Sequence, residues 1–257
     1  MGKRSNWALP YFIFLILFVV LPLILIALYA FRDGSGGFTM RNITKFFTDG
    51  DALSTFAVSI EVAVENTLIC LLLGYPAAWI LANKDLNKSA VTAILFILPM
   101  WINALMRTLA TAELFNVMGF TLGKGTLIFG MVYDYLPFMI YPIYNQLKKM
   151  DNSLSEAAQD LGATPGQVFR KVTLPLSMPG VWSGVMMVFM PTVSTFAISE
   201  FLTNNKIKLF GTIIQENINN SMWNYGAALS LIMLLIILIT TLLQGDDQQE
   251  ETSGALI

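Results

Sequence analysis

Long runs of apolar residues alternate with short polar segments along the 257 residues of this chain. A helix that crosses a hydrocarbon core about 30 Å thick needs roughly 20 mostly apolar residues. Six runs meet this requirement, at residues 10–31, 58–81, 90–110, 127–147, 181–202 and 225–243. The pattern predicts an all-α integral membrane protein, a single domain of six transmembrane helices with a core at residues 56–243.

Proline and glycine interrupt several of these apolar runs. Each weakens a helix in water, because it removes a hydrogen bond or adds backbone freedom. In a membrane bundle, neighbouring helices and Ser or Thr side chains satisfy the freed backbone groups where helices line a cavity. The pattern is typical of transporters, and the interrupting residues are Pro22, Gly74, Pro76, Pro99, Pro137, Pro142 and Pro191.

The composition agrees with lipid surroundings and excludes several classes of function. The chain is 55% hydrophobic and only 12% charged, about half the charged fraction of a soluble domain. Its net charge is −2 and it has no basic tract, so we expect no nucleic-acid partner. Cys70 is the only cysteine and histidine is absent, so we expect no disulfide framework, no metal site, no catalytic residues and no enzyme activity.

The ends of the chain carry less information. The apolar run at 10–31 follows Lys3 and Arg4, but it exceeds the about 7 to 15 residues of a signal-peptide core, so we expect a retained helix. Both termini are placed in the cytoplasm, although lysine and arginine are too evenly distributed to decide the topology by charge alone. The acidic tail, residues 244–257, is interpreted as a solvated terminus.

The polar segment at residues 148–180 has the pattern of two short helices outside the lipid. Ser153 and Glu156 form a Ser-x-x-Glu capping box, which predicts a helix start at Ser153. An apolar face with spacing i, i+3, i+4 and i+7 follows, and Gly162 suits a left-handed stop. That face consists of Leu154, Ala157, Ala158 and Leu161.

A second short helix is predicted after this stop. Thr164 and Pro165 supply an N-cap and a first-turn proline. Pro175 is expected to close the helix, because proline cannot continue the hydrogen-bond ladder. The apolar stripe between these ends is formed by Val168, Phe169 and Val172.

The order of residues in this segment resembles the EAA loop of type I ABC importer permeases. Glu156-Ala157-Ala158 is followed by Gly162, then by nine residues to Val172 and by Leu174-Pro175. Valine at 172 is a mild departure, since isoleucine is frequent there. On the residues alone, an amphipathic connector in which Glu156 only caps a helix explains the pattern equally well.

In that family the first short helix of the loop docks on the ATPase subunit. The resemblance implies that Glu156, Ala157, Ala158 and Gly162 form the docking element, and that Leu174 and Pro175 complete the motif. It also implies a non-catalytic six-helix permease of a prokaryotic inner membrane. Its implied partners are a homologous second permease, a dimer of ATPase subunits and an extracytoplasmic solute-binding protein. ATP and Mg would be bound by the ATPase, and this chain has no Gly-x-x-x-x-Gly-Lys-Ser/Thr loop of its own.

Further stretches are similar to the permeases of spermidine/putrescine importers, in particular the B-type subunit. One departure lies at residues 193–196, Val-Ser-Thr-Phe, in a helix that often carries an acidic residue in this subfamily. The resemblance implies polyamine transport, with the missing charge supplied by Glu200 or by the companion permease. The similar stretches are residues 73–78, 99–101, 107–108, 130–139 and 224–228.

Acidic residues within the apolar runs are candidates for a cation path, because an ionisable group in hydrocarbon is costly and normally faces a cavity. Carboxylates beside aromatic faces suit the separated ammonium groups of a polyamine. Asp134, Tyr135 and Trp101 are the first candidates, with Glu200 as the fourth. The alternative, equally good for Asp134, places the aromatic residues at the membrane interface and the acid in headgroup water.

The remaining charges in these runs are given structural roles. Glu61 and Glu65 lie one turn apart and share a helix face, and we expect them and Glu113 in headgroup water. Arg107 is expected to be an interhelix or interfacial charge partner, with Glu113 as its counter-charge.

Two other functions are compatible with the same residues. The fold could import another small solute, such as a phosphonate or ferric ion; for an anionic solute, Arg107 or the loop lysines would govern transport. A stand-alone secondary transporter or channel could use Glu61, Glu65 and Asp134 as a relay, but such a protein needs no docking helix.

Overall fold

The computed structural model describes residues 9–34, 36–83, 86–87 and 90–243, and these residues contain helices and no strand. Five of the helices are long and apolar enough to cross a membrane, or six if one sharply bent pair counts as a single span. This confirms the predicted all-α membrane class. The predicted acidic tail lies outside the described residues.

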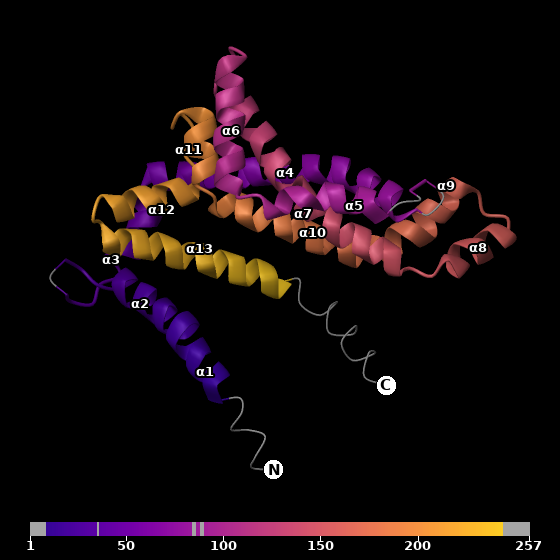
Figure 1. Ribbon diagram of the computed structural model, residues 1–257. Helices are drawn as coiled ribbons and strands as arrows, with labels where there is room; N and C mark the ends of the chain where they lie inside the picture. Colours follow the sequence, from indigo (N-terminus) through magenta and orange to yellow (C-terminus); the bar gives the residue numbers. More distant parts are fainter. Residues whose placement is uncertain (1–8, 35, 84–85, 88–89, 244–257) are drawn as a thin grey trace, which may run out of the picture. The chain divides into compact units, whose positions relative to one another are not determined.

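The described residues form two compact units. The first unit contains residues 9–56 and 210–243, and within it α13 packs on α2, α3 and α12 (Figure 1). The sequence does not predict α3 and α12, because each is too short to span a bilayer. The elements of this unit are α1 (Leu9–Leu15), a π-helical turn (Ile16–Val20), α2 (Leu21–Ala30), α3 (Arg41–Thr48), the start of α4 (Gly50–Ala82), α12 (Phe210–Asn219) and α13 (Trp223–Leu243).

Aromatic and polar contacts fix the short helices of this first unit. The rings of Phe46, Phe56 and Phe210 meet pairwise edge to face, with centroids 5.3 to 6.1 Å apart. Tyr225 of α13 donates its hydroxyl proton to Asp49 over 3.2 Å, and Lys45 of α3 lies 4.0 Å from the centre of the Tyr225 ring. Edge-to-face pairs and a cation over a ring both stabilise such contacts beyond the area that they bury.

The second unit contains the rest of α4 and the elements up to residue 209, and its main contact is between α7 and α10. One apolar cluster includes Cys70 of α4, Met139 and Ile143 of α7, and Val188 of α10. A second cluster joins α4 and α7 to α11. The elements are α5 (Ala90–Ile97), a 3-10 turn (Leu98–Trp101), α6 (Ala104–Val117), α7 (Lys124–Lys149), α8 (Asn152–Asp160), α9 (Pro165–Val168), a π-helical turn (Phe169–Thr173), α10 (Leu174–Ser194) and α11 (Ala197–Thr203).

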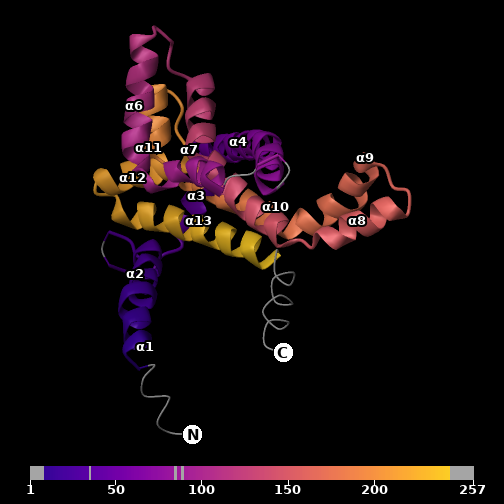
Figure 2. The same ribbon diagram turned by 45° about the vertical axis from the view of Figure 1, so that its right-hand side comes forward.

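The prediction of a single helix at residues 90–110 is wrong. The chain forms two helices, α5 and α6, bent by 90° at the break. Pro99 lies in the 3-10 turn between them, where its missing N–H does not interrupt an α-helical ladder. Asn103 then starts α6 as its N-cap, accepting from the backbone N–H groups of Leu105 and Met106. α6 packs beside α11 and α7 (Figure 2).

The helix predicted at 181–202 also has different ends. α10 begins at Leu174 and ends at Ser194, and α11 is a separate helix that follows two residues later. Thr195 adopts an extended backbone with ψ of 145°, and this ends the helical ladder. Glu200 therefore belongs to the short helix α11 and not to the fifth spanning helix.

Two of the prolines within the described helices closely follow a π-helical turn. The turn Ile16–Val20 ends two residues before Pro22, and the turn Phe169–Thr173 ends two residues before Pro175. The wider π turn makes room for the proline ring, which would otherwise meet the carbonyl four residues earlier. The prediction that Pro175 closes the second loop helix is therefore wrong, since the helix continues into α10.

Candidate functional site

The loop between α7 and α10 contains the two short helices that the sequence predicts, but the first begins one residue earlier. α8 starts at Asn152, with Asp151 as its N-cap and not Ser153. The Asp151 Oδ1 atom accepts from the backbone N–H of Ser153 over 3.0 Å. The hydrogen bonds from Ser153 hold the pKa of the Asp151 carboxyl below its usual range. A charged acceptor at the positive end of the helix is a stronger cap than the Ser153 hydroxyl.

The predicted stop and restart of this loop are confirmed. Gly162 has φ of 83°, the left-handed conformation that glycine adopts without steric cost. The backbone N–H of Gly162 donates to Gln159 and that of Ala163 donates to Ala158, which satisfies the last carbonyls of α8. α9 starts at Pro165 after the N-cap Thr164, whose backbone N–H donates to the Gln167 side chain over 2.9 Å.

The apolar face of α8 is exposed in the described structure. Leu154 is 49% and Leu161 is 89% exposed, and Glu156 and Ala157 are exposed beside them. Ala158 is half-buried. Figure 2 shows α8 and α9 projecting as a hairpin beyond the start of α10. An exposed apolar face of this kind is a feature of protein interaction sites.

The base of the loop is attached to α4. Val168 is buried, and the Phe169 ring meets the rings of Tyr75 and Trp79 edge to face at 5.9 and 6.4 Å. The Tyr75 hydroxyl is 2.9 Å from Oγ of Ser177 on α10. Leu174 is half-buried and Pro175 exposed at this junction. The loop is therefore connected through packed aromatic side chains to two long helices, as a rigid lever requires.

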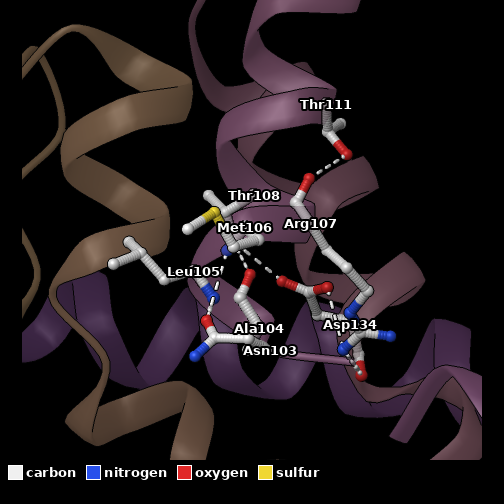
Figure 3. A network of polar contacts seen from close by, with 8 residues as sticks. All are labelled: Asn103, Ala104, Leu105, Met106, Arg107, Thr108, Thr111 and Asp134. Carbon is white, nitrogen blue, oxygen red and sulfur yellow. Dashed lines mark hydrogen bonds and ion pairs between the residues drawn. The ribbon is translucent and has the colours of Figure 1, made fainter. Parts of the chain in front are cut away.

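A buried polar network joins α6 to α7 (Figure 3). Arg107 Nη2 is 3.0 Å from Asp134 Oδ1, and it donates to the Asp134 backbone carbonyl over 3.2 Å. Thr108 donates its hydroxyl proton to Asp134 Oδ2 over 3.0 Å. Arg107 and Asp134 are 6% and 1% exposed, so this is a buried ion pair. The predicted pairing of Arg107 with Glu113 is wrong, because the guanidinium contacts Asp134.

The other predicted path residues lie in different surroundings. Tyr135, next to Asp134 on α7, packs against both apolar clusters of its unit. Trp101 lies in the 3-10 turn after α5 and is 85% exposed, and Glu200 is half-buried on α11. The structure brings Asp134 together with Arg107 and Thr108, which the sequence does not predict as its partners. The sequence does contain a signal for the pairing of Asp134 with Arg107. An acid inside an apolar run needs a partner, and Arg107 lies in a neighbouring apolar run.

Glu61 and Glu65 do share a helix face, as predicted. Lys124 Nζ lies 2.7 Å from Oε1 of Glu61 and 2.8 Å from Oε1 of Glu65. These three side chains are between 39% and 57% exposed, and Glu113 is exposed too. The described residues include no group of three or more His, Cys, Asp or Glu side chains that could hold a metal ion.

Comparison with known proteins assigns these features to a family. The sequence profile described as "Binding-protein-dependent transport system inner membrane component" matches residues 2–245. The chain is a member of this family. This confirms a multi-pass permease subunit of an ABC-type transport system, located in the inner membrane and without a catalytic role of its own.

Several members of this permease family are similar over most of their length. The chain is 34% identical to the "Spermidine/putrescine transport system permease protein PotB" of Haemophilus influenzae, over 86% of this chain and 85% of that protein. The PotB protein of Escherichia coli K12 is also 34% identical, over 85% of this chain and 88% of its own. The corresponding PotC protein of Escherichia coli K12 is 28% identical over 72% of both chains.

A solved structure shows the same permease fold. A chain of a bacterial ABC transporter that imports the acidic polysaccharide alginate has a TM-score of 0.67 to this chain, with 96% of each chain covered. Its sequence identity is 18%, so this similarity concerns the fold. The resemblance to type I ABC importer permeases, predicted from the sequence, is therefore confirmed.

Proposed function

We propose that this permease carries spermidine or putrescine across the inner membrane, from a binding protein to the cytoplasm. The observation that carries the proposal is the 34% identity to two PotB proteins, over at least 85% of each chain. Asp134 supports the same solute, because its buried carboxylate in the spanning helix α7 is held by one arginine contact and could also meet the ammonium groups of a polyamine.

The path would be formed by Asp134 and Tyr135 on α7, with Trp101 and Glu200 as further contributors. Tyr135 follows Asp134 directly on α7 and offers an aromatic ring, which packs against both apolar clusters of its unit. Trp101 is 85% exposed among the described residues, so it can meet either solute or a second permease. Aromatic faces attract the ammonium groups while accommodating the aliphatic segments between them.

The same proposal includes a complex. A homologous second permease, two ATPase subunits holding ATP and Mg, and an extracytoplasmic binding protein would act with this chain. The similarity to PotC supports a companion of the same fold. The exposed face of α8 supports an ATPase contact through Glu156, Ala157, Ala158 and Gly162, with Leu174 and Pro175 at the base of the loop. Both termini and this loop would then lie in the cytoplasm.

Transport would follow alternating access. ATP binding closes the ATPase dimer, and α8 transmits this closure to α10 through the continuous helix at Pro165–Ser194. Such transmission requires that α8 make different contacts with the open and the closed dimer, because only a difference between states shifts an equilibrium.

The experiment is ATP hydrolysis by the complete complex in lipid vesicles, with and without spermidine-loaded binding protein. We expect spermidine to stimulate hydrolysis in the parent, and Glu156→Ala to reduce the stimulation. Gln159→Ala, an exposed polar residue of the same helix, is the matched control and should retain it. Absence of a response to spermidine and putrescine, with normal basal hydrolysis, would overturn the polyamine assignment and favour another small solute.

A further inference from the structure

The buried ion pair between α6 and α7 leaves several polar atoms without a partner. The side chains of Arg107 and Asp134 meet in one contact, 3.0 Å between Nη2 and Oδ1. Within the described part of the chain, Nε and Nη1 of Arg107 make no hydrogen bond, and Oδ1 of Asp134 has the ion-pair contact alone. An arginine that serves only to hold a carboxylate typically does so with two parallel N–H···O bonds. The pair is therefore incomplete on both sides (Figure 3).

The second oxygen of the carboxylate is also held incompletely. Thr108 Oγ1 lies 3.0 Å from Asp134 Oδ2 and 2.9 Å from the backbone carbonyl of Ala104. The hydroxyl has one proton and can donate to only one of the two acceptors at a time. Whenever it donates to Ala104, Arg107 is the only partner of the carboxylate among the contacts described.

We propose that the Asp134 carboxylate is an ammonium-binding site in which Arg107 is the resident cation, displaced by an ammonium group of the solute during transport. This inference rests on the proposed function, since only a cationic solute competes with Arg107. A primary ammonium carries three donors on a compact charge, enough to replace the Arg107 contact at Oδ1 and to reach a neighbouring acceptor. Exchange of one cation for another keeps the carboxylate paired throughout, whereas an unpaired buried charge is strongly unfavourable.

Tyr133 gives the guanidinium a second contact besides Asp134. The Cζ atom of Arg107 lies 5.4 Å from the centre of the Tyr133 ring. A guanidinium over an aromatic face is stabilised there, so Arg107 can leave the carboxylate without losing every favourable contact. Arg107 is also in the first turn of α6, directly after the 90° bend that separates α6 from α5.

The test is equilibrium binding of labelled spermidine to the purified complex without its binding protein. Asp134→Asn removes the negative charge that attracts an ammonium group and should weaken binding at least about tenfold, whereas Arg107→Gln removes the competitor and should tighten it at least about fivefold. In the double variant, binding should equal that of Asp134→Asn alone, because a competitor has no effect once the site is gone. A purely structural ion pair predicts instead that both single substitutions weaken binding.

Arg107→Lys is tested as a second variant, in case the complex with Arg107→Gln does not assemble. Arg107→Lys keeps the positive charge but loses the Nη2 contacts with the side chain and the backbone carbonyl of Asp134, so it should tighten binding by a smaller factor. Unchanged or weaker binding in an assembled Arg107 variant would overturn the inference, as would a parent complex that transports spermidine without binding it here. A parent that neither transports nor is stimulated by spermidine would instead overturn the proposed function.

Discussion

Gly184 of α10 lies directly against Met139 of α7. A Cβ atom at position 184 would be 2.8 Å from the Met139 sulfur and 3.1 Å from the Met139 backbone carbonyl. Glycine at this position is therefore what allows the two central helices of the second unit to approach so closely. Small residues serve the same purpose at many helix contacts in membranes, where close van der Waals packing replaces the hydrophobic driving force.

Replacement of this glycine should separate the two helices. Gly184→Ala is expected to destabilise the folded permease by about 1–3 kcal/mol, because the backbone carbonyl of Met139 cannot move as a side chain can. Thermal unfolding of the complex in detergent measures the effect. Gly166→Ala is the matched control, since no atom of the described residues lies within 4 Å of a Cβ at that position. Equal unfolding temperatures for both variants would contradict the packing argument.

The left-handed conformation of Gly162 gives a second prediction. Gly162→Ala meets no neighbouring atom, but its φ of 83° costs a side-chain-bearing residue about 1–2 kcal/mol. The end of α8 should therefore fray and spermidine-stimulated ATP hydrolysis should fall, while basal hydrolysis stays near that of the parent. Gly162→Asn should retain more stimulation than Gly162→Ala, because asparagine tolerates this conformation better. A larger loss with asparagine would indicate a steric role for the glycine.

Leu161 should contribute to association with the ATPase and not to the stability of the permease. Its side chain is 89% exposed, so Leu161→Ser removes little packing within this chain. If α8 docks through this face, the affinity for the ATPase should fall by at least about 1 kcal/mol. Surface plasmon resonance of the permease pair against the ATPase measures this, with Leu161→Met as the control that keeps apolar area. Unaltered affinity for Leu161→Ser would place the docking surface elsewhere.

The cap at Asp151 predicts how α8 responds to pH. The folded-state pKa of Asp151 is lowered by its hydrogen bonds to Ser153, so the cap stabilises the helix at pH values above the usual aspartate pKa. This contribution is lost as the pH falls through the folded-state pKa, and it should be constant between about pH 5 and 8.

Hydrogen exchange of residues 152–160, corrected for the intrinsic rate, tests the cap. The protection difference between the parent and Asp151→Ala should be constant near neutrality and shrink in acid. Asp151→Asn keeps an acceptor without the charge, and its protection should change less with pH than that of the parent. A difference that grows in acid would contradict the assigned cap.

Much of the site follows from local sequence patterns. Gly162, Thr164 and Pro165 have backbone requirements that depend only on their neighbours, so the stop and restart of the loop are predictable. Ser153 was the exception, because Asp151 is a better acceptor two residues earlier and the two caps compete. The apolar face of α8 is likewise readable from its period, since exposure there does not depend on distant residues.

Only the tertiary structure decides which side chains pair with one another between the apolar helices. The apolar runs determined that the chain is helical and spans a bilayer, because hydrocarbon forces every backbone group to be satisfied within a helix. The 90° bend after Pro99 and the pairing of Arg107 with Asp134 depend on which helices meet and at what height. Arg107 and Glu113 are close in sequence, whereas Asp134 lies on a neighbouring helix. Only the packing of α6 against α7 brings the Asp134 carboxylate to 3.0 Å from Nη2 of Arg107.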